Sequence, residues 1–386
     1  MKIAFVTYEY PPFIMGGAGI YAKNITEKLA ELGVEVTVFT PNINDTENKH
    51  LKNLQVIPLN VNNKIPFKAL QFWLALPKVL RKEHLKNKFD LVHFNGISYW
   101  FMQKKLLNIP QVLTVHHVIK ETNKHNLNLI STLFDINGEN NFLIQLIEKR
   151  AINNVEKIVA VSEFTKTQII KFYKFNSEKI KVIPHGLEIY NRTSSLNSEE
   201  FKVELGLPNK QMLLFVGRIN DPRKGLKTLL MAFKRVLDKT DAILVIVGNG
   251  DKTRFLEFSK KLDISENIFF MGFVNDTALN MLYQVCDLYI CPSKLEGFGL
   301  TVLEALTNGA PVIAFKVGAI PELIKDGING LLIDVDDTKQ MSQAISLLLK
   351  DKHLKDKIKR NNRDYKPKNW IVTAEETKKL YISLME

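Results

Sequence analysis

The stretch PSKLEGFGLTVLE, residues 292–304, places two glutamates eight positions apart around a glycine-rich turn. The apolar segment Leu288 to Cys291 before it has the length and composition of a short buried strand. Gly297 and Gly299 carry no side chain, so the backbone N–H groups of this turn can approach an oxyanion closely. Glu304 follows about one to two helical turns later and is expected to point back at the same site. The alternative is a helix start whose acidic residues are favoured by the helix dipole.

A second group of polar residues follows an apolar segment earlier in the chain. Phe215-Val-Gly-Arg218 ends a short strand-like run, and Lys224-Gly225 begins six positions after Arg218. Arg218 leaves the carboxyl end of the expected strand, which is where open α/β sheets bind ligands. Lys224 precedes an expected helix N-terminus, which favours anions. A guanidinium and an ammonium on one loop suit a diphosphate, whereas the alternative is a pair of solvated surface cations.

Both groups belong to an alternation of short apolar strands and helical segments, which is typical of βαβ units and a parallel sheet. The alternation starts twice, with Lys2 to Thr7 and with Met212 to Val216, and 386 residues suit two domains. We therefore expect one domain at residues 1–187 and a second at 188–370, with a C-terminal helix at 371–386 that crosses back to the first. Further strands are expected at Val34 to Phe39, Asp90 to Phe94, Gln111 to Val115, Lys157 to Val161, Ala242 to Val247, Ile268 to Met271, Leu288 to Cys291 and Pro311 to Ala314, and helices at Ile20 to Leu32 and Gly225 to Leu237.

The composition is that of an ordinary globular protein, with 45% hydrophobic and 24% charged residues. No apolar run approaches the ~18 residues of a spanning helix, and the N-terminal run Ile3 to Val6 is too short for a signal peptide. We therefore expect a cytoplasmic protein.

Of the formal charge of +12, +9 lies in residues 1–187, which hold 24 Lys and Arg against 15 Asp and Glu. Such a basic half suits nucleic acid, anionic lipid or a phosphorylated ligand, or simply confers solubility.

The string at 292–304 resembles the Glu-x7-Glu motif of retaining glycosyltransferases of family 4, which have the GT-B architecture. Arg218 and Lys224, in this order and spacing, match the diphosphate-binding pair of the same family. The resemblance covers almost the whole chain. It implies an α/β fold of two Rossmann-like, doubly wound domains that face each other across a cleft. In the element at 183–186, His185 stands where the family usually has Asn. The further matching elements are Gly16-Gly17, Thr114-Val115-His116, Val161-Ser162, Ile183-Pro-His-Gly186, Gly272-Phe273-Val274 and Ser293.

The resemblance also implies a role for each matching residue. Catalytic roles fall to His116, near the transferred sugar, and to Glu296, which is expected to meet the sugar. Arg218 and Lys224 are expected to bind the donor diphosphate, and Glu304 is expected to bind the ribose. The residues expected to bind the donor are Gly16, Gly17, Arg218, Lys224, Val274, Ser293, Gly297, Phe298, Gly299, Leu300 and Glu304.

The activity implied is transfer of a sugar, with retention at the anomeric carbon, from a UDP- or GDP-sugar to a glycan, lipid-linked or small-molecule acceptor. Such an enzyme would serve cell-surface polysaccharide, glycolipid or glycan synthesis. It needs no cofactor, no metal ion and no nucleic-acid partner. Two alternatives stay open: a nucleotide-sugar epimerase of the same architecture, and a non-catalytic module that binds a nucleotide sugar or a lipid.

Two further motifs have a functional and a structural interpretation. Asp334-Val335-Asp336 matches the Asp-x-Asp pattern that holds a metal in other glycosyltransferases, but we expect a surface turn after a strand at 331–333. The glycines at 16–19 and at 248–250 do not complete Gly-x-Gly-x-x-Gly, so a dehydrogenase is poorly supported.

The stretch Lys64 to Lys88 mixes Lys and Arg with Trp, Phe and Leu. This composition suits an interfacial amphipathic helix on an anionic membrane surface, which would make the protein peripheral on the inner face of the membrane. The alternative is a helix, kinked at Pro77, that packs on the first domain.

Overall fold

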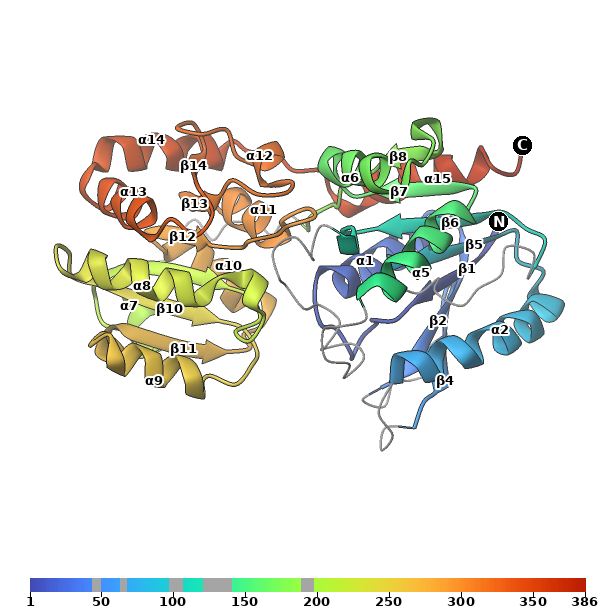
Figure 1. The fold of residues 1–386 in the computed structure, drawn as a ribbon, viewed down its shortest axis with the longest axis horizontal. Helices are drawn as coiled ribbons and strands as arrows, with labels where there is room; N and C mark the ends of the chain where they lie inside the picture. The colour runs from blue at the N-terminus through green and yellow to red at the C-terminus, as the bar shows by residue number, and fades with distance from the viewer. Residues whose placement is uncertain (44–49, 63–67, 97–106, 121–140, 189–197) are drawn as a thin grey trace. The chain divides into compact units, whose positions relative to one another are not determined.

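The computed structural model describes residues 1–43, 50–62, 68–96, 107–120, 141–188 and 198–386, which Figure 1 draws in colour. The chain divides into two compact units. Unit 1 contains Met1–Gly186 together with Lys368–Glu386, and unit 2 contains Leu187–Pro367. The corresponding boundaries expected from the sequence lay after residues 187 and 370.

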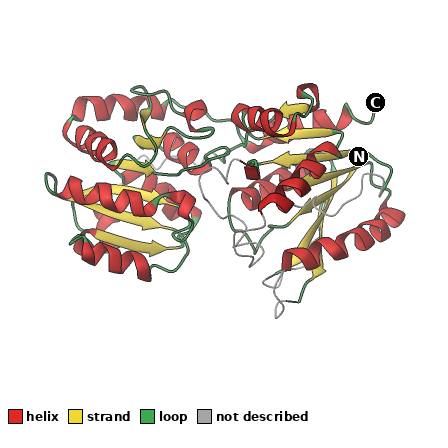
Figure 2. Ribbon diagram, in the orientation of Figure 1, coloured by secondary structure: helices red, strands yellow, loops and turns green. Residues whose placement is uncertain are grey.

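Unit 1 is built on an eight-stranded sheet in the order β3-β4-β2-β1-β5-β6-β7-β8. Neighbouring strands are parallel except for β3 and β4, which are antiparallel. The strands are β1 (Lys2–Thr7), β2 (Glu35–Asn42), β3 (His50–Leu51), β4 (Leu54–Asn60), β5 (Leu91–Asn95), β6 (Gln111–Val115), β7 (Lys157–Ala160) and β8 (Ile180–Val182). The helices of unit 1, red in Figure 2, include α1 (Gly17–Glu31), α2 (Lys68–Asn87), α5 (Asn141–Asn153), α6 (Glu163–Tyr173) and α15 (Trp370–Ile382).

Strand β1 illustrates why the strands of this sheet read as continuous apolar runs. Ile3 and Phe5 are buried in one apolar cluster, whereas Ala4 and Val6 are buried in another. Because successive side chains point to opposite faces, both faces of the sheet must be covered. The strand therefore has no alternating polar face.

Helix α1 ends at Glu31, one residue before the expected end at Leu32, and a glycine follows. Gly33 has a φ of +80°, and its N–H donates to the carbonyl of Ala30. The next N–H, from Val34, donates to the carbonyl of Leu29. Glycine adopts this left-handed conformation at little cost, so the chain can turn directly from α1 into β2.

Helix α15 belongs to unit 1 although it lies at the C-terminal end of the chain. Trp370 and Tyr381 of this helix are buried in the same apolar cluster as Tyr21 of α1. A side chain at Gly186 would place its Cβ 2.4 Å from the backbone nitrogen of Trp370. The segment before residue 187 and the start of α15 therefore cross at a distance that only glycine allows.

Unit 2 is built on a six-stranded, fully parallel sheet in the order β11-β10-β9-β12-β13-β14. One continuous apolar core surrounds the sheet. The strands are β9 (Gln211–Val216), β10 (Ala242–Val247), β11 (Ile268–Gly272), β12 (Leu288–Cys291), β13 (Val312–Phe315) and β14 (Gly330–Ile333). The helices are α7 (Ser198–Glu204), α8 (Leu226–Leu237), α9 (Thr253–Lys261), α10 (Asp276–Val285), α11 (Leu300–Thr307), α12 (Ile320–Leu323), α13 (Thr338–Lys350) and α14 (Lys352–Arg363).

Each sheet reverses its strand order at one position. In unit 1 the chain runs outward from β1 to β2 and later returns to β5 on the other side of β1. In unit 2 it runs outward from β9 through β10 to β11 and then returns to β12 beside β9. Ligands of open α/β sheets bind outside the carboxyl ends of the strands at such switch points. A ligand is therefore expected near the loops after β1, β5, β9 and β12.

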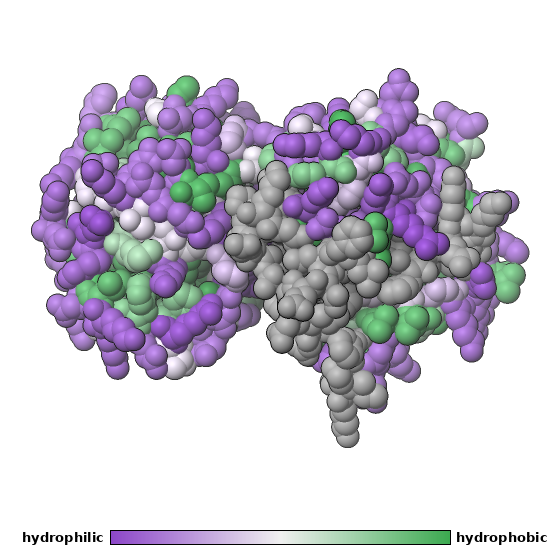
Figure 3. All heavy atoms as spheres, viewed as in Figure 1, coloured by the Kyte–Doolittle hydropathy of each residue, from purple (hydrophilic) through white to green (hydrophobic). Residues whose placement is uncertain are grey.

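Helix α2 lies within the stretch 64–88 and contains Pro77. Phe72 and Trp73, which an interfacial helix would direct into a membrane, are buried in the core of unit 1. Leu74 and Leu85 are exposed, and Figure 3 shows hydrophobic residues only in small groups on a largely hydrophilic face. In the described part of the chain, no helix combines the length and apolar character that a membrane crossing requires.

Candidate functional site

The loop after β9 holds a cluster of two arginines around one carboxylate. Arg218 Nη2 lies 2.6 Å from Asp221 Oδ2, and Arg223 donates to both oxygens of the same side chain. Burial of the Asp221 carboxyl opposes its ionisation, but the hydrogen bonds and charge of Arg223 and the charge of Arg218 outweigh burial and lower its pKa to about 2. Asp221 therefore stays ionised and orients Arg218, whose side chain is 38% exposed.

Lys224 and Glu296 form an ion pair between the loops that follow β9 and β12. Lys224 Nζ lies 2.7 Å from Glu296 Oε1, and the two side chains are only 20% and 13% exposed. Burial favours the neutral form of each group, yet their mutual attraction prevails, so the pKa of Lys224 is raised and the pKa of Glu296 is lowered. The buried hydroxyl of Ser293 also hydrogen-bonds Glu296.

The backbones of these two loops touch, which explains why the pair forms. Gly225 has a φ of +66°, and a Cβ there would lie 2.0 Å from the carbonyl oxygen of Pro292. The N–H of Lys294 donates to the carbonyl of Arg223 at 2.7 Å. On the other side, a Cβ at Gly318 would lie 2.0 Å from the carbonyl oxygen of Glu296. Lys224 and Glu296 are thus held by backbone contacts as well as by their charges.

Glu304 lies on α11 and accepts a hydrogen bond from a buried tyrosine of α10. Tyr283 donates its hydroxyl to Glu304 Oε2 at 3.0 Å. Burial raises the pKa of Glu304 to about 7, although the hydrogen bond from Tyr283 opposes this shift. One carboxylate oxygen is therefore oriented by Tyr283, and the group changes charge near neutral pH.

The glycine-rich turn leads into α11 as the sequence indicated. Gly299 is the N-terminal cap of the helix and has a φ of +92°. A Cβ at this position would lie 2.7 Å from Ile320 Cδ1, so the turn packs tightly against α12. Gly297, Phe298 and Leu300 are half-buried around it.

Two further residues of the matching elements, one of them expected to bind the donor, have simpler surroundings. Val274 follows β11 and packs against the core of unit 2, next to Asn275, which caps α10. In unit 1, the strand-end Ser162 accepts a hydrogen bond from the N–H of Thr165 and so caps α6. Ser162 therefore has a structural role in starting a helix.

His116 follows β6 in unit 1 and is bound to an asparagine at the end of β5. Its Nε2 lies 2.7 Å from Asn95 Oδ1. The amide nitrogen of Asn95 donates to Thr7 Oγ1 and to the carbonyl of Ala18, which leaves the amide oxygen to face the imidazole. An amide oxygen only accepts, so Nε2 carries the proton and Nδ1 of the neutral ring is an acceptor.

The surroundings of His116 keep its ring neutral. Burial, together with the neighbouring imidazoles of His185, His117 and His93, holds the pKa of His116 well below its ordinary value. His185 stacks on Tyr21 with ring centroids 5.1 Å apart. His93 hydrogen-bonds Thr114 and Tyr381.

The N-terminal glycine loop is closed by a carboxylate. Glu9 Oε2 accepts hydrogen bonds from the N–H groups of Met15 and Gly16, each at 2.9 Å. Gly17 is the first residue of α1. A phosphate could reach the N–H of Gly16 only by replacing Glu9, because the carboxylate already occupies that donor.

The Asp-x-Asp motif forms a turn after β14, as predicted. Asp336 has a φ of +61° and accepts hydrogen bonds from Thr228 and from Lys294. No group of three or more His, Cys, Asp or Glu residues capable of holding a metal ion occurs within the ranges that the structure describes.

Sequence reasoning missed the residues that orient the predicted ones. Three residues outside the motifs each form a hydrogen bond to an expected site residue. They are Asp221, Tyr283 and Asn95. Asn95 ends β5 and Asp221 follows β9, and both strands border a switch point. This position is the signal that could have found them. Tyr283 lies inside a helix and offers no such signal.

Comparison with known proteins identifies the class to which this fold and these residues belong. Residues 15–189 match the model of the family described as Glycosyltransferase Family 4, and residues 197–365 match the model described as Glycosyl transferases group 1. An uncharacterized glycosyltransferase of Methanocaldococcus jannaschii is 28% identical over 397 residues, which covers 100% of this chain and 99% of that protein.

Solved structures share the whole fold. Sucrose-phosphate synthase from Thermosynechococcus elongatus superposes with a TM-score of 0.84 at 22% identity, covering 99% of this chain and 98% of that one. HepE from Anabaena, solved in complex with UDP and glucose, superposes with a TM-score of 0.78 at 19% identity, covering 100% of both chains. The predicted fold of two Rossmann-like α/β domains is confirmed. The chain belongs to the glycosyltransferases with the GT-B architecture.

Proposed function

We propose that this glycosyltransferase takes a sugar from a nucleoside-diphosphate sugar, bound on unit 2, and transfers it with retention of the anomeric configuration. The observation that carries this proposal is the largely buried pair of Lys224 and Glu296 on the loops that also carry Arg218, at the switch point between β9 and β12. Together with the turn at 297–300, these groups offer two cations, helix N–H groups and a carboxylate within two adjoining loops. HepE, which was solved in complex with UDP and glucose, supports a UDP-sugar as the first donor to test.

The charges of the site suit departure of a diphosphate. Without a donor, Arg218 is paired with Asp221 and Lys224 is paired with Glu296. A bound diphosphate can replace these carboxylates as the partner of the two cations, while Asp221 and Glu296 reorient or bind other groups. Cations held in a partly buried site stabilise the charge that develops on the leaving group. Glu296 is then free to orient the sugar, and Glu304 to accept hydrogen bonds from the ribose.

Retention is expected to proceed on the front face of the sugar. A covalent route requires a carboxylate against the opposite face of the ring, and no motif in this chain supplies one. In the front-face route, the departing phosphate helps to deprotonate the acceptor hydroxyl, while the protein contributes positioning and charge stabilisation.

The acceptor is expected to be a glycan, a lipid-linked sugar or a small molecule. Membrane binding through 64–88 is not part of this proposal, because Phe72 and Trp73 are buried.

Product analysis tests the proposal and its rivals. The protein is incubated with UDP-, GDP- and ADP-sugars, with and without a pool of acceptors, and the first product is examined by two-dimensional NMR. A new glycosidic bond with the anomeric configuration of the donor is expected. An epimerised donor in the absence of acceptor would indicate the epimerase, and an inverted linkage would contradict the front-face route. A bound but unaltered donor with every acceptor would indicate the binding module.

Donor affinity should depend on pH through Glu304. Its pKa of about 7 means that it is mainly protonated at pH 6 and mainly ionised at pH 8. If the ionised form accepts the ribose hydroxyls, the dissociation constant of UDP at pH 8 should be up to about tenfold lower than at pH 6. Calorimetry at both pH values measures this ratio. UDP itself also titrates, so Glu304→Gln is the control, and an equal ratio in both proteins would remove Glu304 from the ribose site.

Turnover should depend on the neutral state of His116, with its proton on Nε2, that Asn95 favours. Asn95→Asp places a carboxylate 2.7 Å from Nε2 and should raise the pKa of His116, because an opposite charge favours imidazolium. A protonated Nδ1 can no longer accept, so kcat should fall by about tenfold or more at neutral pH and recover as pH rises. The affinity for UDP should stay unchanged. A kcat profile identical to that of the parent protein would contradict a role for the neutral ring, and Thr7→Val controls for loss of the contact that orients the amide.

Transfer should not require a divalent metal ion. The proposed site handles the diphosphate with Arg218 and Lys224, and Asp336 is already bound to Lys294 at 2.6 Å. We expect full initial rates after treatment with excess EDTA. A rate that EDTA abolishes and Mn²⁺ or Mg²⁺ restores would show that the diphosphate needs a metal, with Asp334 and Asp336 as the first ligands to replace.

A further inference from the structure

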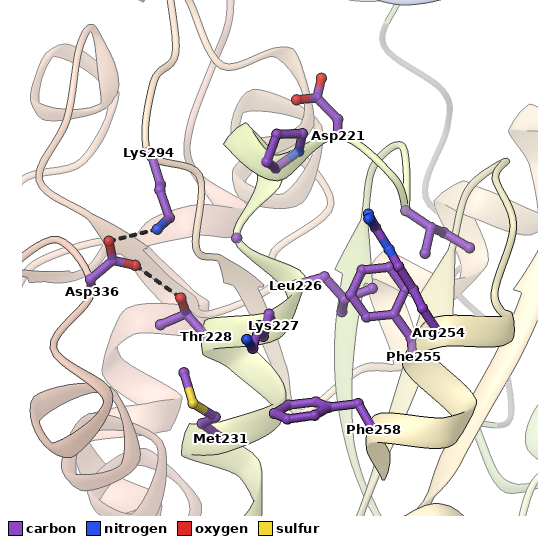
Figure 4. A pocket seen from close by; sticks show the side chains of 13 residues that line it. Asp221, Leu226, Lys227, Thr228, Met231, Arg254, Phe255, Phe258, Lys294 and Asp336 are labelled. Carbon is purple, nitrogen blue, oxygen red and sulfur yellow. Dashed lines mark hydrogen bonds and ion pairs between the residues drawn. The ribbon is translucent and has the colours of Figure 1, made fainter. Parts of the chain in front are cut away.

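A pocket lies on unit 2, apart from the residues proposed to bind the donor. Its volume is about 660 Å³, and Figure 4 shows it between the first turns of α8 and α9. The loop that carries Asp221 forms one end, and the turn that carries Asp336 forms the opposite side. Lys224, Glu296 and Glu304 do not line it. A ligand of this pocket would therefore contact the loop that carries Asp221, but not Lys224, Glu296 or Glu304.

The floor of the pocket is apolar. Leu226 of α8 and Phe255 of α9 are buried beneath it. Met231 and Phe258 are half-buried, and each contributes to the lining, so part of their surface faces the space between the helices. A ring or short apolar chain placed there would remove this surface from water, which favours binding.

The rim carries positive charge above this apolar floor. Lys227 Nζ lies 5.4 Å from the centre of the Phe258 ring, and the Arg254 guanidinium lies 4.7 Å from the centre of the Phe255 ring. Arg254 also donates to the carbonyl of Asn220 at 3.2 Å. Among the described residues, neither cation comes within ion-pairing distance of a carboxylate.

The acidic residues of the lining are already compensated. Asp336 binds Lys294 at 2.6 Å and Thr228 at 2.9 Å, as the dashed lines in Figure 4 mark. Asp221 is shared between two arginines outside the pocket. The charge left over is that of Lys227 and Arg254, so the pocket complements an anion with an apolar body.

We propose that this pocket is a second ligand site, which binds a small organic phosphate or carboxylate with a flat apolar body. The apolar part lies on Phe258 and Met231, and the anionic group lies between Lys227 and Arg254. The site shares no cation with the proposed donor site.

The probe for this site is 1-naphthyl phosphate, titrated into the full chain in the presence of saturating UDP and followed by calorimetry. Binding at one site is expected to persist under these conditions. Reversing both charges, in Lys227→Glu/Arg254→Glu, should raise the dissociation constant by about tenfold or more. Phe258→Ala should weaken the binding of 1-naphthyl phosphate but leave the much weaker binding of inorganic phosphate unchanged.

Matched control variants are available on the same helices. Arg235→Glu on α8 and Lys260→Glu on α9 are exposed, make the same change of charge and lie outside the pocket. They should change the dissociation constant by less than about twofold, since solvent screens distant surface charges. Displacement of the probe by UDP, an equal loss in the control pair, or no binding at all would each overturn the proposal. If UDP does not bind, the titration without UDP still tests this site, so failure of the donor proposal is recognised separately.

Discussion

Lys224→Met is expected to lower the free energy of unfolding of unit 2 by about 3–5 kcal/mol, because it leaves the largely buried carboxylate of Glu296 without its partner. The side chains of this pair are 20% and 13% exposed, so little solvent is available to replace the ammonium. The same variant should raise the dissociation constant of UDP by at least about tenfold, since a charge-assisted contact to the diphosphate is lost. Urea unfolding and calorimetry measure the two effects.

The double variant Lys224→Met/Glu296→Gln separates structure from function. With both charges removed, stability should return to within about 1–2 kcal/mol of the parent protein, because no buried charge remains unpaired. UDP binding should remain as weak as in the single variant. Lys210→Met is the control, since its partner Asp241 is 72% exposed and such pairs contribute less than about 1 kcal/mol. Recovery of UDP binding in the double variant would contradict a direct contact between Lys224 and the donor.

Gly225→Ala is expected to be among the most damaging small substitutions in the chain. Its φ of +66° is unfavourable for alanine, and the added Cβ would lie 2.0 Å from the carbonyl oxygen of Pro292. The conformational cost and the overpacking together should lower the free energy of unfolding by about 3–5 kcal/mol. Relief of the clash must move the loop of Lys224 away from that of Glu296, so UDP binding should fall as well.

Gly206→Ala isolates the backbone part of this effect. Gly206 has nearly the same φ, +67°, but a Cβ there has no neighbour within 4 Å. It should therefore cost only about 1–2 kcal/mol and leave UDP binding unchanged. Equal losses of stability in the two variants would show that contact with Pro292 is unimportant.

The sheet cores were predictable because parallel strands covered on both faces appear as uninterrupted apolar runs. Strands β1, β6, β10 and β12 have the predicted bounds. The antiparallel β3 with its partner β4 was missed, since His50–Leu51 is too short to carry a pattern and β4 contains Pro58. Strand β2 continues past the predicted end at Phe39 through Pro41 to Asn42.

For the loops after β9 and β12, the motifs indicated which side chains lie there but not how they pair. Arg218 and Lys224 were predicted as cations for a diphosphate, and the structure adds that each is bound to a carboxylate. Such pairing depends on the close approach of two loops at Gly225 and Gly318, which is a tertiary contact. The protonation of His116 likewise depends on Asn95, from a strand 21 residues away in sequence.

The most direct test of the central claim is a calorimetric titration of UDP, GDP and ADP into the parent protein and into Arg218→Ala. The account predicts that one of the three binds at a single site with a dissociation constant of about 100 μM or lower, and that Arg218→Ala weakens it by about tenfold or more. Arg235→Ala, on the exposed surface of α8, should bind like the parent protein. Absence of binding by all three nucleotides, or the same affinity in Arg218→Ala as in the parent, would contradict the proposed donor site.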